Sequence, residues 1–207
     1  MNDKIIKLYR TVSTFLLAVL FISTSVSSYW GWFENFYYMT FLGNFLTGIF
    51  MLIVSIIYIC KKAVPQYLIL AFTVLMLLIL GIIIATKDFE IDDGFLFLHF
   101  LNPIFMLIYY LLFSNQTKVR WQLVLITLAM PFAYMIFAFI LGACTGDYIY
   151  YYLDYNNFGV QNTIIFIICT LIGLLIISYG IYFLNRFIQK RSIFSKLSSG
   201  DKNVNYD

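Results

Sequence analysis

Six long apolar runs dominate the 207-residue chain, and the basic residues alternate between the connectors that separate them. Twelve of the 13 Lys and Arg residues lie before the first run, on every second connector, or after the last run. They are Lys4, Lys7, Arg10, Lys61, Lys62, Lys118, Arg120, Arg186, Lys190, Arg191, Lys196 and Lys202. The other connectors hold Lys87 and seven acids, Glu34, Asp88, Glu90, Asp92, Asp93, Asp147 and Asp154. Because basic connectors stay on the cytoplasmic side of a membrane, this alternation predicts six crossings with both termini inside.

Each apolar run approaches or exceeds the length of about 20 residues that a helix needs to cross a membrane. The predicted spans are 11–28, 38–60, 66–86, 94–113, 121–142 and 161–184, and none of them contains Asp, Glu, Lys or Arg. Proton relays and voltage sensors normally carry charge inside the membrane, so this pattern argues against both classes. We therefore predict an all-α fold, with a transmembrane domain over 1–185 and a basic, then polar, cytoplasmic tail over 186–207.

The first apolar run has a second interpretation. Three basic residues precede it and Val26-Ser27-Ser28 ends it, a pattern that is also typical of a cleaved signal peptide. We favour a retained helix, because the run approaches spanning length. The aromatic residues that follow also suit a membrane interface, where Trp and Tyr are enriched.

Composition favours a multi-pass protein of the cell (plasma) membrane whose partners are membrane lipids. The chain is 62% hydrophobic and 11% charged, whereas soluble domains are about 25% charged. The basic residues form no stripe with interleaved aromatics, which argues against nucleic-acid binding. The three cysteines lie at different predicted depths without a Cys or His spacing typical of a metal site, so we expect no metal and no other cofactor. The oligomeric state is left open.

Polar side chains gather near the outer end of two predicted spans. The second and fourth spans both enter the membrane from outside, which places Thr40 and His99, the single histidine, at similar depths. Asn44 lies four residues after Thr40, and Asn102 lies three after His99, so each asparagine shares a helix face with its neighbour. Asp154, together with Asp147, lies on an outer connector that is able to fold over this end.

These residue types support two interpretations. A threonine hydroxyl is a weak nucleophile until a positioned imidazole takes its proton, and a third group commonly orients the imidazole. However, Thr and Asn also hydrogen-bond between membrane helices, and a lone histidine near an interface is often structural. The spacing alone leaves both interpretations open.

Four short motifs occur in order between residues 38 and 159. They are Tyr38-Met39-Thr40-Phe41-Leu42-Gly43-Asn44, His99-Phe100-Leu101-Asn102-Pro103 followed by Leu111-Leu112-Phe113, Pro131-Phe132-Ala133-Tyr134, and Tyr152-Leu153-Asp154 followed by Gly159. With these motifs the chain resembles the androgen-induced membrane protein family, which includes the androgen-dependent TFPI-regulating proteins, and its bacterial six-helix relatives, the Pr-six-Pr proteins. The resemblance implies a six-helix membrane bundle.

Animal members of that family are threonine hydrolases that cleave fatty-acid esters of hydroxy fatty acids. The resemblance places the nucleophile at Thr40 and the base at His99. Our leading hypothesis is thus an intramembrane lipid-ester hydrolase, in which Asn44 and Asn102 orient His99 or stabilise the oxyanion and Asp154 gives further support. The alternative is a non-enzymatic membrane protein that binds or carries a lipid or small molecule, although carriers often contain internal repeats and this chain has no evident one.

Overall fold

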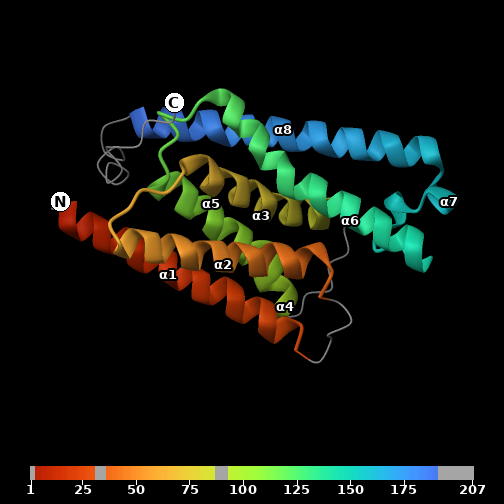
Figure 1. Ribbon diagram of the computed structural model, residues 1–207, viewed down its shortest axis with the longest axis horizontal. Coiled ribbons are helices and arrows are strands. Elements are labelled where there is room, and N and C mark those ends of the chain that lie inside the picture. The colour runs from red at the N-terminus through yellow and green to blue at the C-terminus, as the bar shows by residue number, and fades with distance from the viewer. Residues whose placement is uncertain (1–2, 31–35, 87–92, 191–207) are drawn as a thin grey trace.

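The computed structural model describes residues 3–30, 36–86 and 93–190, and all regular structure within them is helical (Figure 1). The elements are α1 (Asp3–Ser28), α2 (Met39–Ile59), α3 (Gln66–Thr86), α4 (Asp93–Leu96), the π-helix η2 (Phe97–Leu101), α5 (Asn102–Phe113), the 3₁₀-helix η3 (Trp121–Leu128), α6 (Ala129–Thr145), the 3₁₀-turn η4 (Tyr151–Leu153), α7 (Tyr155–Phe158) and α8 (Val160–Lys190). The predicted all-α fold is confirmed.

Four described helical stretches are long and apolar enough to cross a membrane: Lys4–Ser28, Met39–Ile59, Trp121–Thr145 and Val160–Lys190. Two shorter apolar stretches, Gln66–Ile82 and Phe97–Phe113, lie between them in the chain. All six stretches run lengthwise through one bundle (Figure 1).

Helix bounds follow the predicted spans closely in the middle of the chain and depart from them at both ends. The bounds of α3 equal the predicted 66–86, and those of α2 differ from 38–60 by one residue at each end. In contrast, α1 begins at Asp3 rather than at residue 11, and α8 continues to Lys190 rather than ending at 184. Lys and Arg are good helix formers, so a helix continues beyond the apolar run that would cross the membrane. The first part of the predicted tail is therefore helical, while residues 191–207 lie outside the described residues.

The described basic residues gather at one end of the bundle, which we call the basic end. The N-terminal end of α1 and the C-terminal end of α8 lie there together (Figure 1). Arg10 on α1 lies 4.0 Å from the centre of the Tyr58 ring near the C-terminal end of α2. We call the opposite end, with α4, α7, the start of α2 and the connector that follows α6, the acidic end, after its Asp147 and Asp154. The other outer acids of the charge pattern, Glu34, Asp88, Glu90 and Asp92, lie outside the described residues, as does Lys87.

Helices α1 and α2 pack very closely because Gly48 has no side chain. A Cβ atom at this position would lie 2.7 Å from Ile22 Cγ1 and 3.0 Å from the Ile22 backbone nitrogen on α1. Any larger residue would therefore push the two helices apart. Small residues that permit such close backbone approach are typical of membrane helix pairs.

A buried network of amides and a hydroxyl closes the basic end. Gln66 begins α3, and its Oε1 accepts from the Ser114 hydroxyl, which follows α5, at 3.0 Å. Gln116 Nε2 donates to the Gln66 carbonyl at 2.8 Å, and its backbone N–H donates to Asn185 Oδ1 on α8 at 3.1 Å. We call these four residues the basic-end network. It holds α3, α5 and α8 together where α5 ends and the chain turns back.

Two of the predicted spans contain irregular turns, and each turn is followed by a proline. The span 94–113 consists of α4, η2 and α5 in succession, with Pro103 directly after the π-turn. The span 121–142 begins as the 3₁₀-helix η3 and becomes α-helical shortly before Pro131. Proline lacks the N–H that a regular helix requires, so the hydrogen-bond register changes before it.

Candidate active site

Thr40 and His99, which are 59 residues apart in the chain, meet at the acidic end of the bundle. Thr40 lies in the first turn of α2, and His99 lies in the π-turn η2. The Thr40 Oγ1 and His99 Nε2 atoms are 3.0 Å apart, and both side chains are half-buried. This is hydrogen-bond distance, and it matches the geometry that a hydroxyl nucleophile and its general base require.

The other ring nitrogen of His99 determines which proton the imidazole carries. Nδ1 lies 3.1 Å from the Phe95 carbonyl oxygen, and a carbonyl oxygen only accepts hydrogen bonds. Nδ1 therefore carries the hydrogen, and the Nε2 lone pair faces the Thr40 hydroxyl. The Phe95 ring also packs against the imidazole, with ring centres 4.4 Å apart. His99 is thus held in the tautomer that accepts a proton from Thr40.

The π-turn that carries His99 frees a backbone carbonyl beside it. The Asn102 N–H donates to Phe97 O, five residues back, instead of to Leu98 O. Pro103, which would be the π-register partner of Leu98 O, has no N–H to donate. Leu98 O instead accepts from the Asn44 side chain on α2, at 3.1 Å. One irregular turn therefore both presents His99 and joins its backbone to α2.

Asn44 links the backbones that carry the two reactive side chains. Its Nδ2 donates to the Thr40 carbonyl at 2.8 Å as well as to Leu98 O. Asn102 Nδ2 donates to Asn44 Oδ1 at 2.8 Å and to the Thr24 hydroxyl on α1 at 2.9 Å. Both asparagines are fully buried. Breaking such a network leaves buried polar groups unpaired, at a cost of about 1–3 kcal/mol for each group.

This geometry corrects the predicted role of the two asparagines. The amide nitrogen of each asparagine already donates twice, to backbone carbonyls, to the other asparagine or to Thr24. They are therefore not available to donate to an oxyanion. Asn44 and Asn102 position the two helices, and Asn44 acts on His99 through the Leu98 backbone rather than through the ring. The Oδ1 atom of Asn102 is buried and has no hydrogen-bond partner within the described residues.

The first turn of α2 offers a different set of donors. The N–H groups of an initial helical turn have no acceptor within their own helix, and Tyr38 at the N-cap position makes no side-chain cap. Thr40 and Phe41 both belong to this turn. Their N–H groups, together with the positive end of the helix dipole, favour negative charge next to the Thr40 side chain.

Aromatic residues from α6 and the connector after it cover the start of α2. The Tyr134 hydroxyl donates to the Tyr37 carbonyl at 3.1 Å, and the Tyr134 and Tyr150 rings lie 6.4 Å apart. Burial raises the pKa of Tyr150, while hydrogen bonding with Tyr134 and with the Met39 backbone acts in the opposite direction. Because burial dominates, Tyr150 stays protonated near neutral pH and contributes a neutral hydroxyl to this cover.

Asp154 does not join the Thr40–His99 pair, which corrects its predicted supporting role. Its carboxylate accepts from the backbone N–H groups of Asn156 and Asn157, at 3.0 and 3.2 Å, and from the Asn157 side chain. Asp154 is therefore the N-cap of α7. It stabilises the connector that follows α6, and the geometry supports no catalytic role for it.

Two groups at the site were not identified from the sequence. The Thr24 hydroxyl accepts from Asn102 and donates to Leu20 O at 2.8 Å. It could not be singled out from the sequence, because α1 carries several similar hydroxyls and residue spacing does not determine how the helix is rotated. The Phe95 carbonyl is a backbone group four residues before His99. This spacing of four residues could have indicated the bond from the sequence, because polar side chains commonly bond to the preceding turn of their own helix.

No group of three or more His, Cys, Asp or Glu residues capable of holding a metal occurs in the described ranges. Cys60, Cys144 and Cys169 are free and exposed.

Comparisons with protein-family models, curated proteins and solved structures found no match to the chain.

Proposed function

We propose that the protein is an intramembrane threonine hydrolase that cleaves lipid (fatty-acid) esters. The observation that supports this most strongly is the 3.0 Å contact between Thr40 Oγ1 and His99 Nε2, with the imidazole held in the accepting tautomer by the Phe95 carbonyl. The resemblance to the androgen-induced membrane protein family, which rests on short motifs, suggests the same pair.

The first half of the reaction forms an acyl-enzyme. Thr40 Oγ1 attacks the ester carbonyl carbon, and its proton passes to His99 Nε2. The imidazolium then gives this proton to the alcohol oxygen as the carbon–oxygen bond of the ester breaks. The Phe95 carbonyl, which accepts from Nδ1–H, stabilises the transient positive charge.

The second half releases the acid. A water molecule attacks the acyl carbon while His99 Nε2 takes one of its protons, and the bond from Thr40 Oγ1 to that carbon breaks. The proton then returns to Thr40, and the enzyme is restored. In both halves the carbonyl oxygen becomes negative, and the Thr40 and Phe41 N–H groups are placed to stabilise it. A single such donor contributes about 3–4 kcal/mol in other hydrolases.

The same proposal includes six crossings of the plasma membrane, with the basic end in the cytoplasm and Thr40 near the outer surface. The distribution of basic residues supports this orientation. The two shorter apolar stretches, Gln66–Ile82 and Phe97–Phe113, would cross within the bundle, where neighbouring helices cover them. Ester substrates would then reach the site from the outer leaflet.

The native cysteines offer a test of this orientation. Cys144 lies near the acidic end of α6, and Cys60 follows α2 at the basic end; both are exposed. In variants that each keep one cysteine, a membrane-impermeant maleimide should label Cys144 in intact cells and Cys60 only after permeabilisation. Labelling of Cys60 from outside would contradict the orientation.

A fluorophosphonate probe tests the chemistry. This electrophile reacts with activated hydroxyls, so wild-type protein should be modified at Thr40, as mapped by mass spectrometry. The modification should disappear in His99→Ala, because Thr40 then lacks its base. A folded wild-type protein that stays unmodified would instead favour the alternative, a lipid- or small-molecule-binding protein.

A carrier is the less favoured form of that alternative. A carrier must open toward both sides of the membrane in turn. The basic-end network holds α3, α5 and α8 together through buried hydrogen bonds, which would have to break in every cycle. This arrangement suits a site that is reached from one side.

A further inference from the structure

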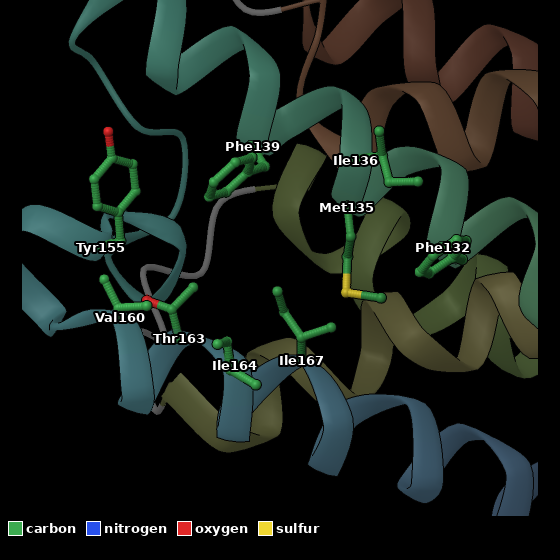
Figure 2. Close-up of a pocket in the computed structure, with 9 residues that line it drawn as sticks. All are labelled: Phe132, Met135, Ile136, Phe139, Tyr155, Val160, Thr163, Ile164 and Ile167. Carbon is green, nitrogen blue, oxygen red and sulfur yellow. The ribbon is translucent and has the colours of Figure 1, made fainter.

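The segment formed by η3 and α6 contacts α8 through η3 toward the basic end and separates from α8 along α6 toward the acidic end. Toward the basic end, the Thr127 hydroxyl of η3 lies 2.9 Å from that of Ser178 on α8. Toward the acidic end, a cavity of about 460 Å³ lies between the two helices, and Tyr155 lies at its end (Figure 2). We call this cavity the α6–α8 groove. Its lining residues are Phe132, Met135, Ile136, Phe139, Tyr155, Val160, Thr163, Ile164 and Ile167.

The chemistry of the α6–α8 groove suits a hydrocarbon chain. Its lining contains no charged residue, and its polar groups are limited to one threonine and one tyrosine. Apolar cavities do not hold ordered water, and this one opens between two helices that are apolar enough to span a membrane. Its volume lies in the range of about 300–1,000 Å³ that is usual for small-molecule sites.

The dimensions of the groove indicate a single extended chain. The lining residues on α8 run from Val160 to Ile167, and those on α6 run from Phe132 to Phe139. Seven residues of helical rise correspond to about 10 Å. A groove of this length is able to hold part of one extended acyl chain lying along the helices.

The groove is separated by one side chain from a second cavity on the side of the candidate active site. Met135 lines both the groove and a smaller cavity of about 50 Å³. Tyr134 and Tyr150, whose hydroxyls lie over the start of α2, also line this smaller cavity, as does Met39. Met39 directly precedes Thr40, and consecutive Cα atoms are only about 3.8 Å apart. An acyl chain in the groove therefore points one end toward the turn that carries the nucleophile.

We infer that the α6–α8 groove binds the acyl chain of the ester substrate, which enters sideways from the outer leaflet. This inference rests on the proposed function for the identity of the chain as part of a substrate. Met135 then lies where the chain passes from the groove toward Thr40, and Tyr155 lies against its distal end. The groove would favour esters whose acyl chain is long enough to reach it over esters of acetate.

Two isoleucines on α8 provide a matched pair of variants. Ile164 lines the groove and Ile172 does not, yet both side chains are 52% exposed. We expect Ile164→Trp to fill the groove and to lower kcat/KM for p-nitrophenyl palmitate by about tenfold, while kcat/KM for p-nitrophenyl acetate changes by less than about twofold. We expect Ile172→Trp to leave both values within about twofold of wild type. Ile136→Trp fills the groove from α6 and should reproduce the Ile164→Trp result should that variant fold poorly.

Occupancy is measured separately with a palmitate analogue that carries a mid-chain diazirine. Crosslinks in wild-type protein should map to groove-lining residues and should decrease about tenfold in Ile164→Trp but not in Ile172→Trp. Crosslinks spread evenly along α8, including Ile172, or equal losses in both tryptophan variants, would overturn the inference. Crosslinks within the groove without hydrolysis of any ester would instead support the binding site and refute the proposed hydrolase.

Discussion

Thr40→Ala is expected to abolish ester hydrolysis while the protein still inserts and folds. The substitution removes Oγ1, the proposed nucleophile, and leaves the Asn44 bond to the Thr40 backbone carbonyl intact. Loss of a nucleophile typically lowers kcat by at least about 10³-fold. The measurement is the hydrolysis rate of purified protein in lipid nanodiscs, with size-exclusion chromatography and circular dichroism to verify folding.

Two further substitutions separate chemistry from packing. Thr40→Ser keeps a hydroxyl at the same position and should retain hydrolysis to within about tenfold of wild type. Thr47→Ala removes a buried hydroxyl from the same helix, where it donates only to the Gly43 carbonyl at 2.6 Å, and should leave the rate nearly unchanged. Equal activity in Thr40→Ala and Thr47→Ala would refute Thr40 as the nucleophile.

His99→Ala is expected to lower kcat by about 10²–10⁴-fold, which is the usual contribution of a general base. The substitution removes Nε2, the proposed acceptor of the Thr40 proton, and also the Nδ1 bond to Phe95 O. Binding of long-chain esters should change little, because the α6–α8 groove is lined by other residues. The expected result is therefore a large decrease in kcat with a small change in KM.

Exogenous imidazole distinguishes a base from a structural histidine. It fits the space that the deleted ring leaves and accepts a proton, so it should restore a measurable part of the activity of His99→Ala. It should have no effect on Thr40→Ala. Activity in His99→Ala at the wild-type level would refute the role of His99 as the base.

The sequence predicts the bounds of a helix well where its apolar run stops at a proline or at charged residues. The start of α3 follows Pro65, and α2 ends just before Lys61 and Lys62, so proline and charge mark bounds that the structure shares. The first and last helices extend further because Lys, Arg and polar residues are compatible with a helix outside the membrane. The π-turn before Pro103 was not predicted, since proline indicates a break but not which hydrogen-bond register replaces the regular one.

The candidate site was predictable in its residue types but not in its contacts. Spacing placed Thr40 with Asn44 on one helix face and His99 with Asn102 on another, and those two faces meet. The rotation of the helices, which determines what each side chain touches, depends on packing details such as the Gly48 contact. The N-cap role of Asp154 could have been predicted from the sequence, because an aspartate two residues before Asn156 and five before Gly159 is typical of a capped short helix.

The Thr127–Ser178 contact and the α6–α8 groove lie toward opposite ends of the region where η3 and α6 face α8. A buried hydrogen bond between Thr127 and Ser178 joins the two segments toward the basic end, whereas toward the acidic end residues 146–159, with η4 and α7, link α6 to α8. A small change in the width of the groove therefore requires no rupture of the Thr127–Ser178 bond. Chains of differing thickness, such as saturated and kinked ones, would be accommodated by such a change, while the Thr40–His99 distance, set by Asn44 on a separate pair of elements, stays constant.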